Sequence, residues 1–135
     1  MKSTGSKLIF SMVVILLVAF VLIFWGQVKV NMGEEEVVIN GTFTSSTTIK
    51  YCDINSIDYV NSFEFGKRDL GFGTFKMNLG RYSNKQFDKY KAYAYSNVKA
   101  FVIVKYSDEV LVFNQSTVND TKSIYQELAS KTGRK

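Results

Sequence analysis

The chain has 135 residues, enough for one ordinary domain and a short appendage, and it carries a formal net charge of +5. It contains no histidine and a single cysteine, Cys52, which excludes an intramolecular disulfide and a cysteine-based zinc site. Histidine is also the commonest general base. The composition therefore argues against an enzyme, and we expect no catalytic, cofactor-binding or metal site.

The first predicted element is an apolar helix over residues 8–26, preceded by a basic flank over residues 1–7. Residues 8–25 read LIFSMVVILLVAFVLIFW, and a helix of that length spans about 27 Å, close to the hydrocarbon thickness of a bilayer. The alternative is a cleaved signal peptide. Its apolar segment is usually shorter and ends in a small-x-small pattern, which residues 22–27 (LIFWGQ) lack. We therefore predict one transmembrane helix.

The charges on either side of this helix predict its orientation. Lys2 and Lys7 precede it without any acid, whereas Lys29 and then three glutamates, residues 34–36, follow it. Positive flanks stay in the cytoplasm. We expect a cytoplasmic N-terminus, a hinge over residues 27–34 next to the membrane, and a translocated domain over residues 35–135.

The domain is predicted to be mainly β, because its apolar and polar residues alternate with the period of a strand. Residues 66–73 and 80–86 are rich in glycine, charge or polar side chains, so we expect loops there. The last two strands are continuous apolar runs and should form a hairpin that is buried on both faces. The strands are expected over residues 35–40, 47–51, 57–65, 74–79, 88–95, 100–104 and 110–113.

A C-terminal helix is expected after Asn114, where the apolar period changes. Thr117 and Asp120 can form an acidic variant of the capping box, and Gly133 is a suitable stop. The helix has one apolar stripe, formed by Thr121, Ile124, Tyr125 and Leu128.

Seven strands must protect their edges, and a sheet that bends over on itself does so by near-closure. We therefore predict a partly open barrel or roll of about seven antiparallel strands. The C-terminal helix would cap its open end by packing on Phe101, Ile103 and Phe113. This element order is that of a pleckstrin-homology-like (PH-like) fold.

Several stretches of the domain follow the pattern of a known family: residues 49–51 (IKY), 54–59 (INSIDY), 68–75 (RDLGFGTF), 100–105 with 110–114, and 121–128 (TKSIYQEL). On these stretches the chain resembles the bacterial PH domain family, in its small membrane-anchored members, over residues 34–129. The resemblance implies a PH-like roll, binding or assembly at a bacterial cell membrane, and no common enzyme activity. One departure is that residues 41–46, the loop between the first two strands, carry no basic residue. The phosphate pocket of eukaryotic lipid-binding PH domains is therefore not supported.

The function that we expect is a non-enzymatic interaction module at the membrane, with an unknown protein or a second copy of the chain as its partner. One alternative is contact with anionic lipid, because residues 65–105 carry nine basic residues and two acids. These lysines can equally be solvated side chains on outer strand faces. A weaker alternative is a subunit of a membrane enzyme. The residues chosen for lipid contact are Lys67, Arg68, Arg81 and Lys85.

Nucleic acid is not an expected partner. Residues 89–95 (KYKAYAY) interleave lysine with tyrosine, as a stacking platform for single strands would. A domain tethered to a membrane is an unsuitable place for such a platform, and tyrosine on a half-buried strand needs no special purpose.

Overall fold

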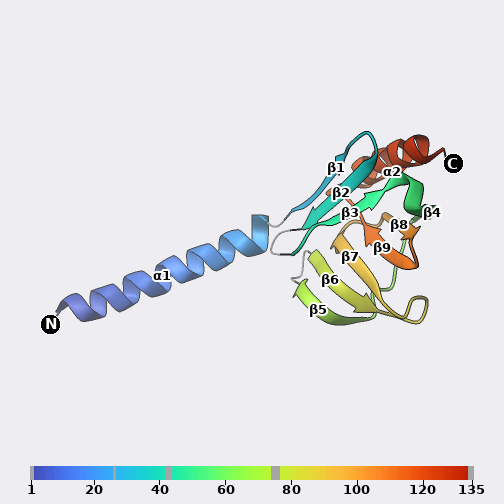
Figure 1. Ribbon diagram of the computed structural model, residues 1–135. Coiled ribbons are helices and arrows are strands. Elements are labelled where there is room, and N and C mark those ends of the chain that lie inside the picture. The colour runs from blue at the N-terminus through green and yellow to red at the C-terminus, as the bar shows by residue number, and fades with distance from the viewer. Residues whose placement is uncertain (1, 26, 42–43, 74–76, 134–135) are drawn as a thin grey trace.

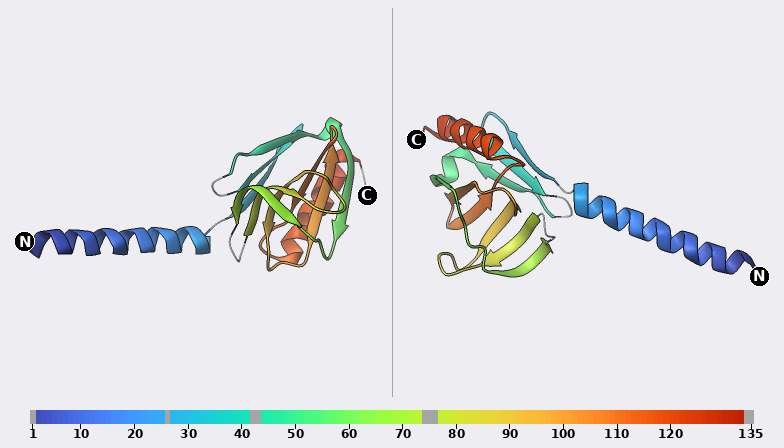
Figure 2. Two further views of the ribbon diagram at one scale, coloured as in Figure 1. Left: turned by 90° about the horizontal axis from the view of Figure 1, so that it is seen from below. Right: turned by 180° about the vertical axis from the view of Figure 1, so that it is seen from behind.

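The computed structural model describes residues 2–25, 27–41, 44–73 and 77–133. In that part of the chain, nine strands form two sheets, and one α-helix precedes them while another follows (Figure 1). The long N-terminal helix α1 (Lys2–Trp25) projects away from the β domain, whereas the short C-terminal helix α2 (Val118–Thr132) lies on it (Figure 2). The predicted mainly β class with a C-terminal helix is confirmed.

The first sheet has three antiparallel strands in the order β1-β2-β3, and a 3₁₀ turn, Tyr51–Asp53, leads out of it. The second has six strands in the order β4-β8-β9-β7-β6-β5. Its pairs are antiparallel except β7 with β9, which is parallel, so the prediction of antiparallel strands alone is wrong there. The strands are β1 (Val28–Met32), β2 (Glu36–Gly41), β3 (Thr47–Lys50), β4 (Ile54–Val60), β5 (Lys67–Gly73), β6 (Met77–Ser83), β7 (Tyr90–Tyr95), β8 (Phe101–Tyr106) and β9 (Glu109–Phe113).

Helix α1 contains the helix that was expected over residues 8–26, apart from residue 26, which lies outside the described residues. Within the described part of the chain, however, no helix is long and apolar enough to cross a membrane. The structure therefore does not support the prediction of a transmembrane helix.

Five strands, β2, β3, β7, β8 and β9, fall within two residues of their predicted positions. β1 lies inside the stretch that was expected to be a hinge, and Val28 at its start is buried. β4 begins and ends earlier than expected, because it starts directly after the 3₁₀ turn. Residues 74–76 of the fourth predicted strand lie outside the described residues, and its remainder belongs to β6, which continues through Ser83.

The largest error is β5, which lies where a glycine-rich loop was expected. Gly71 on β5 pairs with Gly80 on β6, and their φ angles are +131° and +127°. A Cβ on Gly71 would lie 2.2 Å from the carbonyl oxygen of Leu79, and one on Gly80 would lie 2.1 Å from that of Leu70. The glycines thus allow two strand backbones to approach closely and bend, and they do not mark a turn.

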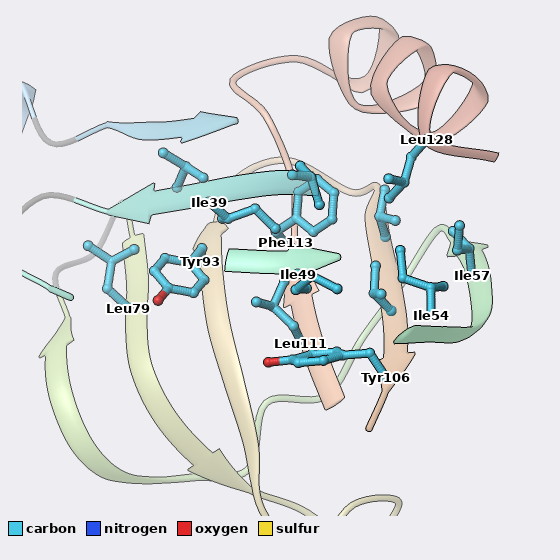
Figure 3. Close-up of a cluster of buried hydrophobic side chains, with 14 of the residues drawn as sticks. Ile39, Ile49, Ile54, Ile57, Leu79, Tyr93, Tyr106, Leu111, Phe113 and Leu128 are labelled. Carbon is cyan, nitrogen blue, oxygen red and sulfur yellow. The ribbon is translucent and has the colours of Figure 1, made fainter. Parts of the chain in front are cut away.

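The main core lies between the two sheets and beneath α2 (Figure 3). Phe113, Leu79 and Ile39 are fully buried there, together with Leu128 from α2. A second cluster covers the outer face of the six-stranded sheet, where the segment between β4 and β5 contributes partly buried aromatic rings. Its buried members are Tyr82, Tyr90, Ala92, Ala94, Phe101, Ile103 and Val112.

Helix α2 begins and ends as predicted. The backbone N–H of Asp120 donates a hydrogen bond to Thr117 Oγ1 at 3.0 Å, and Gly133 adopts the left-handed conformation after the last turn. Leu128 packs in the same core as Phe113, as expected. Phe101 and Ile103 belong instead to the outer cluster, because alternate residues of β8 face opposite sides of the sheet. The expected contact of α2 with those two residues is therefore wrong.

Candidate functional site

Two adjoining hollows open beside strands β5, β6 and β7. The inner pocket, of about 460 Å³, lies between these strands and the end of the β2–β3 connection. The rim pocket, of about 720 Å³, continues toward the turn between β8 and β9. Both hollows are lined by Leu70, Arg81 and Lys91. The remaining lining of the inner pocket is Thr44, Ser45, Gly71, Gly80 and Tyr93.

Arg81 and Lys91 stand directly opposite each other in the antiparallel pairing of β6 with β7. Met77 and Leu79 of β6 belong to the main core between the sheets, whereas Tyr82 belongs to the outer cluster. Because side chains alternate along a strand, Arg81 lies on the inner face of the sheet, the face of the main core. Side chains that face each other in this way have Cβ atoms about 5 Å apart, and like charges there are destabilising. Neither cation forms an ion pair with a carboxylate of the described residues.

Hydrogen bonds from Tyr93 fix one wall of the inner pocket. Its hydroxyl donates to the backbone oxygen of Ser45 at 2.7 Å and shares a second hydrogen bond of 2.8 Å with Thr47 Oγ1. These bonds tie the three-stranded sheet to β7. Burial raises the pKa of Tyr93 despite the opposing effects of the Thr47 hydrogen bond and the positive charge of Arg81. Tyr93 therefore stays protonated at neutral pH and serves as a hydrogen-bonding strut.

Strand β5 forms the opposite wall. The paired Gly71 and Gly80 let the backbones of β5 and β6 lie close together beside the hollow. Leu70 lies at the opening of the inner pocket with 69% of its surface exposed, whereas Leu79 and Leu111 of the same sheet are fully buried. The wall thus combines closely paired backbone with one exposed apolar side chain.

The four residues predicted to contact lipid do not all converge. Lys67 pairs with Ser83 and Arg68 with Tyr82, so these two cations lie with the following Lys85 at one end of the β5–β6 hairpin. The positive charge of Arg68 also opposes the rise that burial gives to the pKa of Tyr82, which belongs to the outer cluster. We call Lys67, Arg68 and Lys85, all exposed, the hairpin-end patch.

Arg81, the fourth predicted residue, lies on the inner face with Lys91, a residue that sequence reasoning did not select. The sequence does carry one signal for it. Lys91, Tyr93 and Tyr95 alternate along one face of β7, which leaves a lysine in a row of core tyrosines. The register that sets Lys91 opposite Arg81 could not be read from that pattern.

The polar groups that line the inner pocket are cations, hydroxyls and backbone groups. Within the described residues, no group of three or more histidine, cysteine, aspartate or glutamate side chains is placed to hold a metal ion. The described lining of the inner pocket includes no carboxylate. An arrangement of this kind can accept an anionic group.

Comparison with known proteins identifies the domain. The family model described as the bacterial PH domain matches residues 28–128, from the first residue of β1 to the buried Leu128 of α2. This match confirms the resemblance found in the sequence and includes β1 in the domain. Neither the curated proteins nor the solved structures give a match. The chain therefore belongs to the bacterial PH domain family.

Proposed function

We propose that this protein is a non-enzymatic interaction module that works at a membrane and binds another protein, including a second copy of itself. The family supports the coarser part of this proposal, because PH domains are in general interaction modules without catalysis. The finer part, attachment to a membrane and binding of a protein, rests on α1 and on the free edge of the six-stranded sheet.

The observation that carries the proposal is the surface of α1. Leu8, Phe10 and Ile15 remain 64%, 70% and 65% exposed. Exposed apolar area costs about 25 cal/mol per Å², so a helix of this kind needs an apolar environment. The whole apolar run of the sequence, residues 8–25, with two lysines before it, favours a bacterial cell membrane as that environment. The same charges favour a cytoplasmic N-terminus and a domain on the other side.

The surface that fits a protein partner is strand β5. It ends the six-stranded sheet, so one row of its backbone groups has no neighbouring strand among the described residues. The strand at the other end, β4, lies against α2. An open edge with an exposed apolar side chain such as Leu70 is suited to pairing with a strand of another chain.

A photo-crosslinking amino acid in place of Leu70, in the intact protein in its membrane, tests this function. The matched control carries the same amino acid in place of Lys122, which is exposed on α2. We expect adducts from position 70 only. An adduct of twice the chain mass identifies a second copy, and any other discrete mass identifies a different protein. Equal adducts from both positions, or none from position 70, would refute the proposal.

Anionic lipid is a second candidate ligand, because the hairpin-end patch gathers three exposed cations. Residues 27–135 should be used, since Val28 belongs to the core, and circular dichroism should confirm that this fragment folds. We expect it to float with anionic vesicles at low salt and to be released as salt rises. Changing the four predicted residues, Lys67, Arg68, Arg81 and Lys85, to glutamine should abolish flotation. A charge-matched control changes Lys50, Lys99, Lys122 and Lys131.

Equal binding of this fragment to neutral vesicles would remove lipid from the candidates. So would equal loss of binding in the control variant, because the control lysines lie outside the hairpin-end patch. Crosslinking from position 70 is independent of both results.

A further inference from the structure

The strongest unexplained feature of the domain is the cation pair in the inner pocket. Arg81 and Lys91 face each other across two paired strands and have no carboxylate partner among the described residues. Arg81 is exposed and Lys91 is half-buried, so solvent screens part of their repulsion. Like charges in that position are still destabilising, and a neutral side chain at either place would remove the cost. Groups that weaken a fold in this way are typical of sites where a ligand supplies the missing charge.

We propose that the inner pocket binds a phosphate-type dianion between Arg81 and Lys91. Arginine offers a planar fork of donors that fits two phosphate oxygens, and lysine adds a compact positive charge from the opposite strand. With Cβ atoms about 5 Å apart, both side chains can reach one anion at the same time. The ligand is a phosphate monoester, either free in solution or at the head of an anionic lipid.

The remaining lining of the inner pocket suits such an ester. Thr44 and Ser45 bring hydroxyl-bearing residues to the wall across from the cations. Gly71 and Gly80 also line the pocket and add no side chain to it. Leu70, at the opening of the pocket, offers an apolar contact for the organic part of the ester. The volume of about 460 Å³ lies within the usual range for small-molecule sites.

The charges around the rim limit the size of the ligand. Asp69, Asp108 and Glu109 line the rim pocket, where Lys89 is the cation added to the shared pair. Their negative charge disfavours a polyanion that extends beyond the inner pocket, such as a nucleic acid strand. The site is therefore selective for a single small anionic group.

Thermal unfolding of the intact protein in neutral detergent tests the site, with sodium phosphate and glycerol phosphate as probes. A ligand that binds only the folded state raises the unfolding midpoint as its concentration exceeds the dissociation constant. We expect a saturable rise for the native protein. Arg81→Gln and Lys91→Gln should each weaken binding at least about tenfold, and Lys99→Gln should bind as the native protein does.

Two further measurements test the site: the stability of the variants without ligand and the pH dependence of binding. Without ligand, Arg81→Gln and Lys91→Gln should be at least as stable as the native protein, so lost binding cannot be ascribed to misfolding. Glycerol phosphate should bind more weakly at pH 5 than at pH 7.5, because the second pKa of a phosphate monoester is about 6 and the ester is therefore a monoanion at pH 5. Sulfate, which stays a dianion, should keep its binding.

Vesicles of phosphatidic acid, compared with vesicles of neutral phosphatidylcholine, separate the two sources of the ligand. A midpoint shift with both soluble probes and phosphatidic acid supports any accessible phosphate monoester. A shift with phosphatidic acid alone supports a lipid headgroup. The proposal is overturned if no probe stabilises the protein, or if Arg81→Gln and Lys91→Gln respond like the native chain. It is also overturned if only neutralising Lys67, Arg68 and Lys85 removes binding, since the ligand would then sit on the hairpin-end patch.

Discussion

Two tyrosines of the inner core should respond in opposite directions when their hydroxyl groups are removed. Tyr93 and Tyr106 are 4% and 6% exposed and reach into the core from opposite sides of β9 (Figure 3). The Tyr93 hydroxyl is bonded to Ser45 and Thr47. The Tyr106 hydroxyl is buried and has no hydrogen-bond partner among the described residues. We expect Tyr106→Phe to stabilise the domain and Tyr93→Phe to destabilise it.

The magnitudes follow from what each change removes. A hydrogen bond contributes about 1 kcal/mol net, and a buried polar group without a partner costs about 1–3 kcal/mol. Tyr106→Phe removes such a cost and should raise the free energy of unfolding by about 1 kcal/mol. Tyr93→Phe removes two hydrogen bonds and should lower it by about 2 kcal/mol. Since 1 kcal/mol shifts the midpoint of a domain of this size by about 4–8 °C, the two variants should melt at least about 12 °C apart.

Thermal unfolding of the intact protein in mild detergent, followed by near-ultraviolet circular dichroism of the tyrosines, measures this separation. The native protein should melt between the two variants. If Tyr106→Phe lowers the midpoint as much as Tyr93→Phe does, the Tyr106 hydroxyl makes a stabilising interaction. The reasoning from hydrogen-bond satisfaction would then be wrong for this core.

Three other predictions concern the core, the glycine pair and alkaline pH. Leu128→Ala should lower the free energy of unfolding by about 2–5 kcal/mol in denaturant unfolding, because Leu128 is fully buried. The control Lys122→Ala, at an exposed position of α2, should change it by about 0.5 kcal/mol or less. Equal effects of the two changes would show that α2 does not seal the core. Gly80→Ala should lower the free energy of unfolding by at least about 2 kcal/mol, because Gly80 has a φ of +127° and the new Cβ would lie 2.1 Å from a carbonyl oxygen. The control Gly5→Ala, with no atom near its Cβ, should not lower it. A Gly80→Ala variant of native stability would contradict the close approach of β5 and β6. Burial raises the pKa of Tyr90 and Tyr106 above the usual 10.0, so above that pH the folded state keeps protons that the unfolded state loses. The thermal unfolding midpoint should therefore stay constant up to about pH 10 and fall above it, less steeply in Tyr106→Phe. A midpoint that is unchanged at about pH 11 would contradict this.

Local patterns in the sequence determined most of the elements. Period-two alternation located β2, β3 and β7, and apolar runs located the β8–β9 hairpin, because those features depend only on which face of a strand is buried. The ends of α2 were also local, since Thr117 bonds within its own first turn and Gly133 needs no distant contact. The same local patterns also indicate the bacterial PH domain family, whose family model matches residues 28–128.

The elements that were missed depend on contacts between distant residues. β1 reads as a polar hinge, yet the Val28 backbone N–H donates to the Tyr95 hydroxyl 67 positions away, at 2.9 Å. The sequence of β5 predicts a loop, because Gly71 can occupy a strand here only when a second glycine, Gly80 on β6, lets the two backbones approach closely. No local propensity contains that information.

The candidate site was decided by tertiary structure for the same reason. The sequence shows that the loop after β2, residues 41–46, has no basic residue, and this argued against a phosphate pocket. The fold brings Ser45 of that loop into one hollow with Arg81 and Lys91, which come from strands later in the chain. Strand register determines which side chains meet across a sheet, and a shift of one residue would turn Arg81 toward the opposite face. The composition shows that the domain is rich in cations, but only the pairing of β6 with β7 places Arg81 opposite Lys91.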